Sequence, residues 1–300
     1  MNLPSVTIQQ LLEAGVHLGH KTFRWNPKMN KYIFGSKNSI HIINLVKTLE
    51  MINTALNEVH KCISSGGKIL LVSTKKQAAE AISTLAKDTS QFYVNHRWLG
   101  GMLTNWKTIS NSIKRYKKLS EDIKKEDTGF TKKEILKMGV QKDKLERSLG
   151  GIADMKKIPN MIFIIDTNVE SLAVAEAKKL NIPIVAVIDT NSDPTNINYP
   201  IPGNDDARRA INLYCDLIKE TILDAQKNIS IKHEDESEFN IKAEDSKSKD
   251  KINTSIPKLK SKETKSIKTK ESKPKTKIDA IKKTKSIFSK IKKLASKKSK

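Results

Sequence analysis

Short apolar runs that alternate with helical patterns constrain the fold of this chain more than any other feature. Residues 68–73, 161–166 and 183–189 read KILLVS, MIFIID and PIVAVID, which are nearly continuous apolar runs of strand length. Runs of this kind are typical of strands that are buried on both faces of a parallel sheet. A shorter β-rich run lies at 92–95, and a helical pattern at 169–180 separates the last two runs. The alternation predicts an α/β fold with a mainly parallel sheet.

One segment, 105–157, contains no strand signal and interrupts this alternation. Its apolar residues recur at three- and four-residue steps in two stripes. The first stripe comprises Trp106, Ile109, Ile113, Tyr116, Leu119 and Ile123, and the second comprises Ile135, Met138, Leu145, Leu149 and Ile152. A turn is predicted at 126–129, and Thr131 can cap the second helix. The pattern predicts an antiparallel, coiled-coil-like helical hairpin, whose lysine-rich outer faces either are solvated or face RNA.

The chain is strongly basic, with a net charge of +23 and a pI near 9.8. The segment 229–300 carries 23 Lys against 10 acidic residues, a net charge of +13. The preceding residues, with 33 basic and 23 acidic side chains, carry the remaining +10. Because the part expected to fold is itself basic, nucleic acid is the favoured partner, and an anionic membrane surface bound by the tail is the alternative.

Composition also predicts the domain boundaries. Residues 1–104 and 158–228 form an α/β domain that we expect to bind RNA, and 105–157 form the inserted hairpin. Residues 229–300 are rich in Lys and Ser and poor in aromatic residues, which predicts a disordered basic tail. No signal peptide pattern is present, and no apolar run approaches the roughly 20 residues of a membrane span. The two cysteines are far apart in the sequence, as is typical of reduced thiols in a cytoplasmic protein.

The motifs of common catalytic sites are missing from the sequence. It contains no GxxxxGK[ST], no GxGxxG after a strand, no GxSxG, no HExxH and no CxxC. A nucleotide- or metal-dependent enzyme on the same α/β scaffold is the alternative to a binding protein, and it would need a phosphate loop or a paired acid–base site. We therefore predict no catalysis, no cofactor and no small-molecule substrate.

Cationic and aromatic side chains in loops and at helix starts are the candidate binding residues. Lysines at a helix start suit phosphate oxygens, and Arg and Trp suit exposed bases. The candidate RNA-binding residues are Lys21, Arg24, Trp25, Lys28, Lys31, Lys75, Lys76, His96, Arg97, Trp98, Arg208 and Arg209. Gly100 and Gly101 can also set the angle at which the hairpin leaves the α/β domain. Trp98 then has a second interpretation, as a side chain packed beneath the hairpin. Arg97 is then the stronger candidate.

A cluster of acids near the third apolar run permits a bound cation. The candidate ligands are Asp189, Asp193, Asp205 and Asp206 with His17 or His20. The run that starts at Asp189 does not fit a calcium loop, because Pro194 and Pro200 stand at its sixth and twelfth positions. Turn and cap hydrogen bonds explain these acids more simply, so no metal site is predicted.

Five ordered stretches give the chain a resemblance to a known family. They read LLEAGVHLGHKTFRWNPKMNKYIFGSKNSIHIINLVKT, VSTKKQA, HRWLGGMLTNW, LGGIADM and DTNSDPTNINYPIPGNDDARRAI. In this order and spacing they resemble the family of the second protein of the bacterial small ribosomal subunit, over about residues 6–225. Ser192 stands where many members have Cys, and Asn160 where an Asp is common. The tail is not part of the shared pattern.

The resemblance implies a Rossmann-like, three-layer α/β domain with a protruding coiled-coil hairpin, and it implies no catalysis. It also implies binding to small-subunit ribosomal RNA at the junction of head and body, in the cytoplasmic ribosome. The implied partners are this RNA and neighbouring small-subunit proteins, including the large mRNA-binding protein. No membrane is implied.

Overall fold

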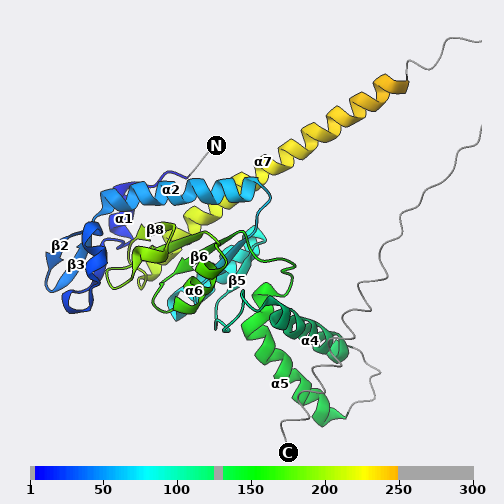
Figure 1. Cartoon of the computed structure of the whole chain (residues 1–300), viewed down its shortest axis with the longest axis horizontal. Coiled ribbons are helices and arrows are strands. Elements are labelled where there is room, and N and C mark those ends of the chain that lie inside the picture. The colour runs from blue at the N-terminus through cyan, green and yellow to red at the C-terminus, as the bar shows by residue number, and fades with distance from the viewer. Residues whose placement is uncertain (1–3, 125–130, 249–300) are drawn as a thin grey trace, which may run out of the picture. The chain divides into compact units, whose positions relative to one another are not determined.

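A five-stranded parallel sheet forms the centre of the chain (Figure 1). The computed structural model describes residues 4–124 and 131–248, with side chains up to residue 228. The strands of this sheet are β4 (Ile69–Val72), β5 (Phe92–Val94), β6 (Met161–Ile165), β7 (Ile184–Ile188) and β8 (Tyr199–Pro202). Their order, β5-β4-β6-β7-β8, is a doubly wound order. The chain adds β5 on one side of β4 and then crosses back to add β6, β7 and β8 on the other side. This sheet confirms the predicted α/β fold.

Alternate residues of each buried strand face two separate cores. Leu71 and Phe163 pack with helices α1 (Ile8–Glu13), α2 (Leu45–Ser64), α3 (Lys76–Thr89) and α7 (Arg208–Ser248). Leu70 and Ile164 pack on the other face with α6 (Ser171–Lys179) and with the base of the inserted hairpin. Helices cover both faces of the sheet, so the three-layer expectation is confirmed.

The strand β8 was not predicted, because Pro200 and Pro202 interrupt its apolar pattern. Both prolines are tolerated because β8 pairs only with β7 and lies at the edge of the sheet. A short 3-10 turn, η4 (Pro194–Asn196), connects these two strands.

A second, antiparallel sheet lies within residues 18–43, a polar and basic stretch whose first part, up to residue 38, has the pattern of a loop. Its strands β1 (Leu18–Lys21), β2 (Ile33–Lys37) and β3 (Ile40–Ile43) have the order β1-β3-β2, and the 3-10 turns η1 (Thr22–Arg24) and η2 (Pro27–Tyr32) join β1 to β2. The alternation in SIHII, residues 39–43, predicts only the last of these three strands in the chain, β3. The turn between β2 and β3 consists of Asn38 and Ser39 with φ values of 52° and 60°. Two consecutive residues in the left-handed region are typical of a type I′ hairpin turn. Such turns usually contain a glycine, and its absence here makes the turn hard to predict from the sequence.

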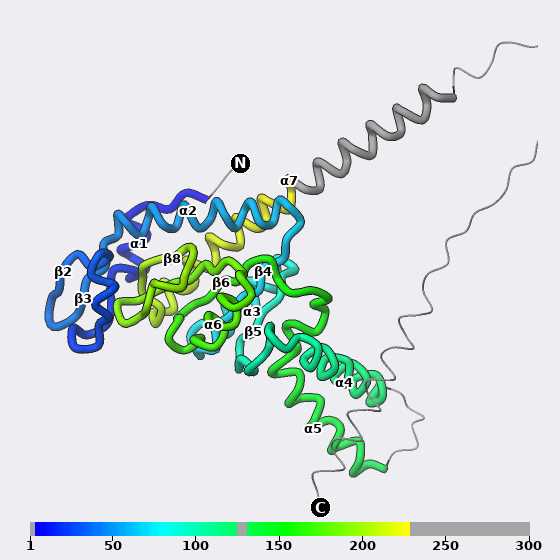
Figure 2. The backbone as a smooth tube through the Cα atoms, in the orientation of Figure 1, coloured from blue at the N-terminus to red at the C-terminus, as the bar shows by residue number. Residues whose placement is uncertain are grey.

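The inserted segment forms two packed helices, α4 (Trp106–Lys124) and α5 (Lys132–Leu149), followed by the 3-10 turn η3 (Gly150–Ile152) (Figure 2). Thr131 forms a capping box with Glu134, as its position predicts. The predicted turn at 126–129 lies outside the described residues. The helical pair is confirmed, whereas its coiled-coil geometry stays a prediction.

Gly151 joins this helical pair to the sheet at a close backbone contact. A Cβ atom at this position would lie 2.1 Å from the carbonyl oxygen of Tyr93, so only glycine fits. Ile109 and Leu149 are buried in the same core as Val94 and anchor the base of the two helices.

Helix α7 continues to Ser248, well past the expected end near Lys227. Residues 229–248 contain neither Gly nor Pro, so nothing in the sequence interrupts the helix there. The rest of the predicted tail, 249–300, lies outside the described residues. Within the described ranges, no helix is both long enough and apolar enough to cross a bilayer.

Candidate nucleic-acid interface

The N-terminal antiparallel sheet and its two 3-10 turns present four of the nine candidate Lys and Arg residues. Residues 14–49 contain six Lys or Arg and no acidic residue. The structure places five candidates in this segment on the surface: Lys21, Arg24, Trp25, Lys28 and Lys31 are all exposed. Asn26 fixes the segment to the end of β7, because its backbone N–H donates to the carbonyl of Thr190 over 2.8 Å. A cationic surface is therefore held against the carboxyl edge of the parallel sheet.

Aromatic rings lie among these cations. The Arg24 guanidinium lies 5.5 Å from the ring centroid of Phe23, and the Lys31 ammonium lies 4.7 Å from that of Tyr32. Phe23 and Phe34 are 73% and 77% exposed, and neither is among the candidates predicted from the sequence. Phe34 lies on strand β2, where alternate side chains face solvent. A strand prediction at 33–37 would therefore have indicated that Phe34 is exposed. Exposed rings beside guanidinium and ammonium groups suit both phosphates and bases.

Lys28 differs from its neighbours because it has a carboxylate partner. Its Nζ lies 2.7 Å from Asp193. This hydrogen bond, with two more from Thr195, lowers the pKa of Asp193 to about 2. Lys28 therefore connects the 3-10 turn η2 to η4, and it contributes less free positive charge than the sequence indicated.

The Gly-Gly loop separates two roles that lie side by side in the sequence. His96 and Arg97 are exposed, whereas Trp98 is only 6% exposed. The indole Nε1 of Trp98 donates to Glu176 over 3.0 Å. The covered ring and the hydrogen bond of its one donor inside the protein favour the packing interpretation of Trp98 over base stacking.

Glu176 on α6 holds this loop in place, although no sequence motif marks it. Besides Trp98, it accepts hydrogen bonds from the backbone N–H groups of Gly101 (2.8 Å), Leu103 (2.9 Å) and Thr104 (3.0 Å) and from the Thr104 hydroxyl (3.1 Å). Burial alone raises the pKa of Glu176, but these hydrogen bonds outweigh it and lower the pKa below its usual value. The loop that carries Arg97 is therefore rigidly positioned.

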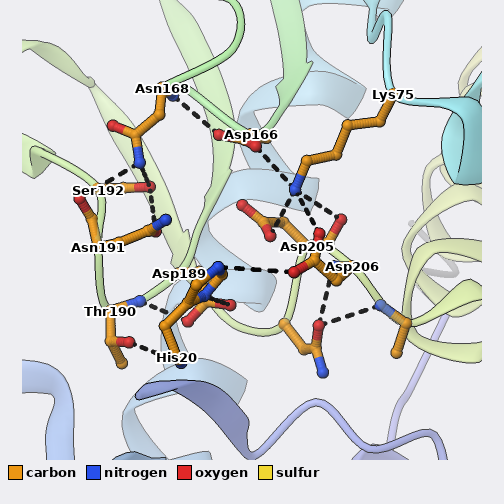
Figure 3. Close-up of polar contacts among 12 residues, drawn as sticks. His20, Lys75, Asp166, Asn168, Asp189, Thr190, Asn191, Ser192, Asp205 and Asp206 are labelled. Atoms are coloured by element: carbon orange, nitrogen blue, oxygen red, sulfur yellow. Dashed lines mark hydrogen bonds and ion pairs between the residues drawn. The ribbon is translucent and has the colours of Figure 1, made fainter. Parts of the chain in front are cut away.

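Lys75 also has a different role from the predicted one. Its Nζ lies 2.7 Å from Asp166, 2.8 Å from Asp205 and 2.8 Å from Asp206 (Figure 3). Burial lowers the pKa of Lys75, but the three carboxylates outweigh burial and raise it. The ammonium is engaged by three carboxylates in an internal ion-pair cluster, which favours a structural role of Lys75 over the expected phosphate contact. The next residue, Lys76, is exposed.

This cluster gathers side chains from the carboxyl ends of several strands, the edge at which doubly wound sheets bind ligands. Asp166 follows β6, and Asp189 follows β7. Burial raises the pKa of Asp205 to about 7, with repulsion from Asp166 and Asp189 acting in the same direction. His20 completes the cluster, with its Nδ1 2.8 Å from Asp189, and this hydrogen bond raises the pKa of His20.

Three of the six candidate cation ligands come together in the cluster. Donor atoms of His20, Asp189 and Asp205 lie within 4.8 Å of one another. Asp193 pairs with Lys28 instead. One oxygen of Asp205, Oδ2, is buried and has no hydrogen-bond partner among the described residues. A nitrogen and two carboxylates are a donor set that zinc accepts.

The remaining candidates lie at the start of α7 and α3. Arg208 and Arg209 are exposed. Arg208 and Lys76 line the same cavity of about 290 Å³ between the two helices. The structure thus brings the candidates together in three places: the N-terminal sheet, the Gly-Gly loop and this cavity.

The chain is similar to known proteins over most of its length. The description "Ribosomal protein S2" belongs to the family profile that matches residues 11–225. Relatives named "Small ribosomal subunit protein uS2" match over 224 residues, 75% of this chain and 88% of each relative. Those from Sinorhizobium medicae (strain WSM419) and Rhizobium meliloti (strain 1021) are 59% identical, and the one from Agrobacterium fabrum (strain C58) is 57% identical.

Proposed function

Because the chain belongs to the ribosomal protein S2 family, we propose that it binds ribosomal RNA of the small subunit through the three exposed cationic surfaces described above. Its role in translation is structural, as in its relatives, and it is not an enzyme. The ribosome of the cytoplasm is its place of action. The RNA contacts are made by Lys21, Arg24, Trp25, Lys31, Lys76, His96, Arg97, Arg208 and Arg209.

The N-terminal sheet is the observation that supports this proposal most. A segment of 36 residues without a single acid, 14–49, presents its cations and aromatic rings on one small sheet. Unpaired cations in such a group gain most from a polyanion, because each phosphate contact releases condensed counterions. Exposed rings beside them add stacking, which single-stranded RNA offers and a membrane surface does not.

The finer placement follows from the family resemblance and stays a proposal. The protein would lie at the junction of head and body, next to other small-subunit proteins, and would support docking of the large mRNA-binding protein. Three apolar side chains in the first 50 residues are available to such a neighbour, because Leu12, Leu18 and Val46 are each about half exposed.

Sedimentation of the full chain with small subunits tests the proposal. With about six phosphate contacts, we expect the protein to sediment with subunits at low salt and to lose roughly 1,000-fold in affinity between about 50 and 200 mM salt. A protein that stays in the soluble fraction at every salt concentration would instead favour the enzyme alternative.

The cluster around Asp205 supports a second candidate function, binding of a divalent cation such as zinc. The buried Oδ2 of Asp205 has no hydrogen-bond partner among the described residues, and His20 and Asp189 place their donor atoms beside it. We expect zinc to raise the thermal midpoint of the metal-free protein and to leave that of the Asp205→Asn variant unchanged. An equal shift in both proteins would exclude this site. Asp193→Asn is the matched control, because Asp193 lies in the same region and pairs with Lys28.

A further inference from the structure

A cavity of about 470 Å³ lies where the loop after β5 meets helix α5. Its walls come from two elements, the Gly-Gly loop and helix α5 of the inserted helical pair. The residues that matter for its chemistry are His96, Arg97, Leu99, Val140, Lys144 and Arg147. We propose that this cavity, the junction pocket, binds a backbone phosphate of the ribosomal RNA between Arg97 on the loop and Lys144 and Arg147 on α5. The inference rests on the proposed function and adds two residues to it.

The charges of the junction pocket favour an anion. Arg97, Lys144 and Arg147 are opposed by one acid, Asp143, which leaves an excess of two positive charges. None of the three cations makes a hydrogen bond or an ion pair with another residue in the described part of the chain. By contrast, Lys75 is paired with carboxylates at 2.8 Å or less. Cations that converge without an internal partner remain available for an external phosphate.

The pocket also has an apolar side chain on each wall. Leu99 on the loop is half-buried, and Val140 on α5 is exposed. Apolar side chains next to a cation reduce the local dielectric and strengthen its attraction to a phosphate. The two guanidinium groups can bind phosphate oxygens in pairs, which an ammonium cannot do.

Both walls of the pocket are held in place before any ligand binds. Glu176 fixes the loop through hydrogen bonds to Trp98, Gly101, Leu103 and Thr104. The wall formed by α5 continues into η3, where Gly151 contacts the backbone of β5. A prepositioned site loses little conformational entropy on binding. A phosphate held by both walls would tie the helical pair to the α/β domain.

Paired substitutions on one helix test the proposal. The probe is the small subunit stripped of this protein, and binding of the full chain is measured across a range of salt concentrations. We expect Lys144→Ala/Arg147→Ala to lower the slope of log affinity against log salt by roughly 0.7 to 0.9, because the one phosphate in the pocket is no longer held by α5. The control Lys133→Ala/Lys137→Ala removes the same charge from α5 outside the pocket and should leave the slope nearly unchanged. Equal slopes in the two double variants would overturn the proposal.

A double-mutant cycle tests whether the two walls act together. If Arg97 and Arg147 hold the same phosphate, the combined Arg97→Ala/Arg147→Ala variant should weaken binding less than the product of the two single effects. In the control pair, the Arg97→Ala/Lys137→Ala variant should weaken binding by the product of the two single effects. Arg147→Lys keeps the charge and should retain most of the salt slope, which separates loss of charge from loss of folding.

The outcomes distinguish this inference from the proposed function. Salt-sensitive binding of the unaltered chain, together with wild-type behaviour of the Lys144→Ala/Arg147→Ala variant, would overturn the junction pocket alone. A chain that fails to bind the stripped subunit at any salt concentration would overturn both.

Discussion

Replacing Glu176 with Ala is expected to lower the free energy of unfolding by about 3 kcal/mol. Glu176 accepts hydrogen bonds from four residues of the Gly-Gly loop, and Trp98 Nε1 would be left buried without an acceptor. The loss exceeds that of a single hydrogen bond, because several donors are orphaned together. Urea denaturation measures the change, and the exposed Glu50→Ala on α2 is the control, with an expected effect below about 0.5 kcal/mol.

The pH dependence of Glu176 gives this prediction a second readout. The pKa of Glu176 is lowered in the folded state from its ordinary value of 4.5. The stability from its ionised form is therefore present above pH 4.5 and is lost as the pH falls below it, through the folded-state pKa. We expect the gap in stability between the unaltered chain and Glu176→Gln to shrink over that interval. A gap that stays constant from neutral pH to pH 3 would contradict the role assigned to Glu176.

Replacing Lys75 with Met is the second large effect that we expect. Removing one partner from a buried ion-pair cluster typically costs about 3–5 kcal/mol, because uncompensated charges remain. Here Asp166, Asp205 and Asp206 would lose the ammonium that all three contact. Lys76→Met is a close control, because Lys76 is adjacent in sequence, exposed and free of carboxylate partners among the described residues.

Protonation should compensate for the missing ammonium. Asp205 has a raised pKa of about 7, so the folded state takes up its proton before the unfolded state does. Without Lys75 this pKa rises further, and the loss of stability should diminish as the pH falls from 7 toward 4. Lys75→Met/Asp205→Asn should recover part of the loss at pH 7. Equal stability of Lys75→Met and Lys76→Met would exclude a structural role for the cluster.

The strands at the centre of the parallel sheet were predictable from the local sequence. The buried strands β4, β6 and β7 follow directly from apolar runs that only a two-sided core explains. The strand β8 was missed because prolines are permitted only by its edge position, which is a property of the assembled sheet. The N-terminal sheet was missed because its turn uses Asn38 and Ser39 in left-handed conformations without a glycine signal.

The basic and aromatic character of the interface was predictable from the sequence, but the exposure of each individual side chain was not. Lys75 and Lys76 are neighbours in the sequence, yet one is engaged by three carboxylates and the other is exposed. Trp98 and Arg97 are also neighbours, yet Trp98 is buried and donates to Glu176, whereas Arg97 is exposed. Glu176 lies more than 70 residues away in the sequence. Long-range partners decide which side chain is free, and a single sequence does not contain that information.

Equilibrium binding of the full chain to stripped small subunits, measured as a function of salt, tests the central claim most directly. The account predicts a steep loss of affinity with salt for the unaltered chain and a slope lowered by about 1.5 for Lys21→Ala/Arg24→Ala. The variant Lys87→Ala/Lys178→Ala removes equal charge from exposed helix positions and should keep the original slope. Binding that does not depend on salt, or equal slopes for the two variants, would contradict an RNA interface on the N-terminal sheet.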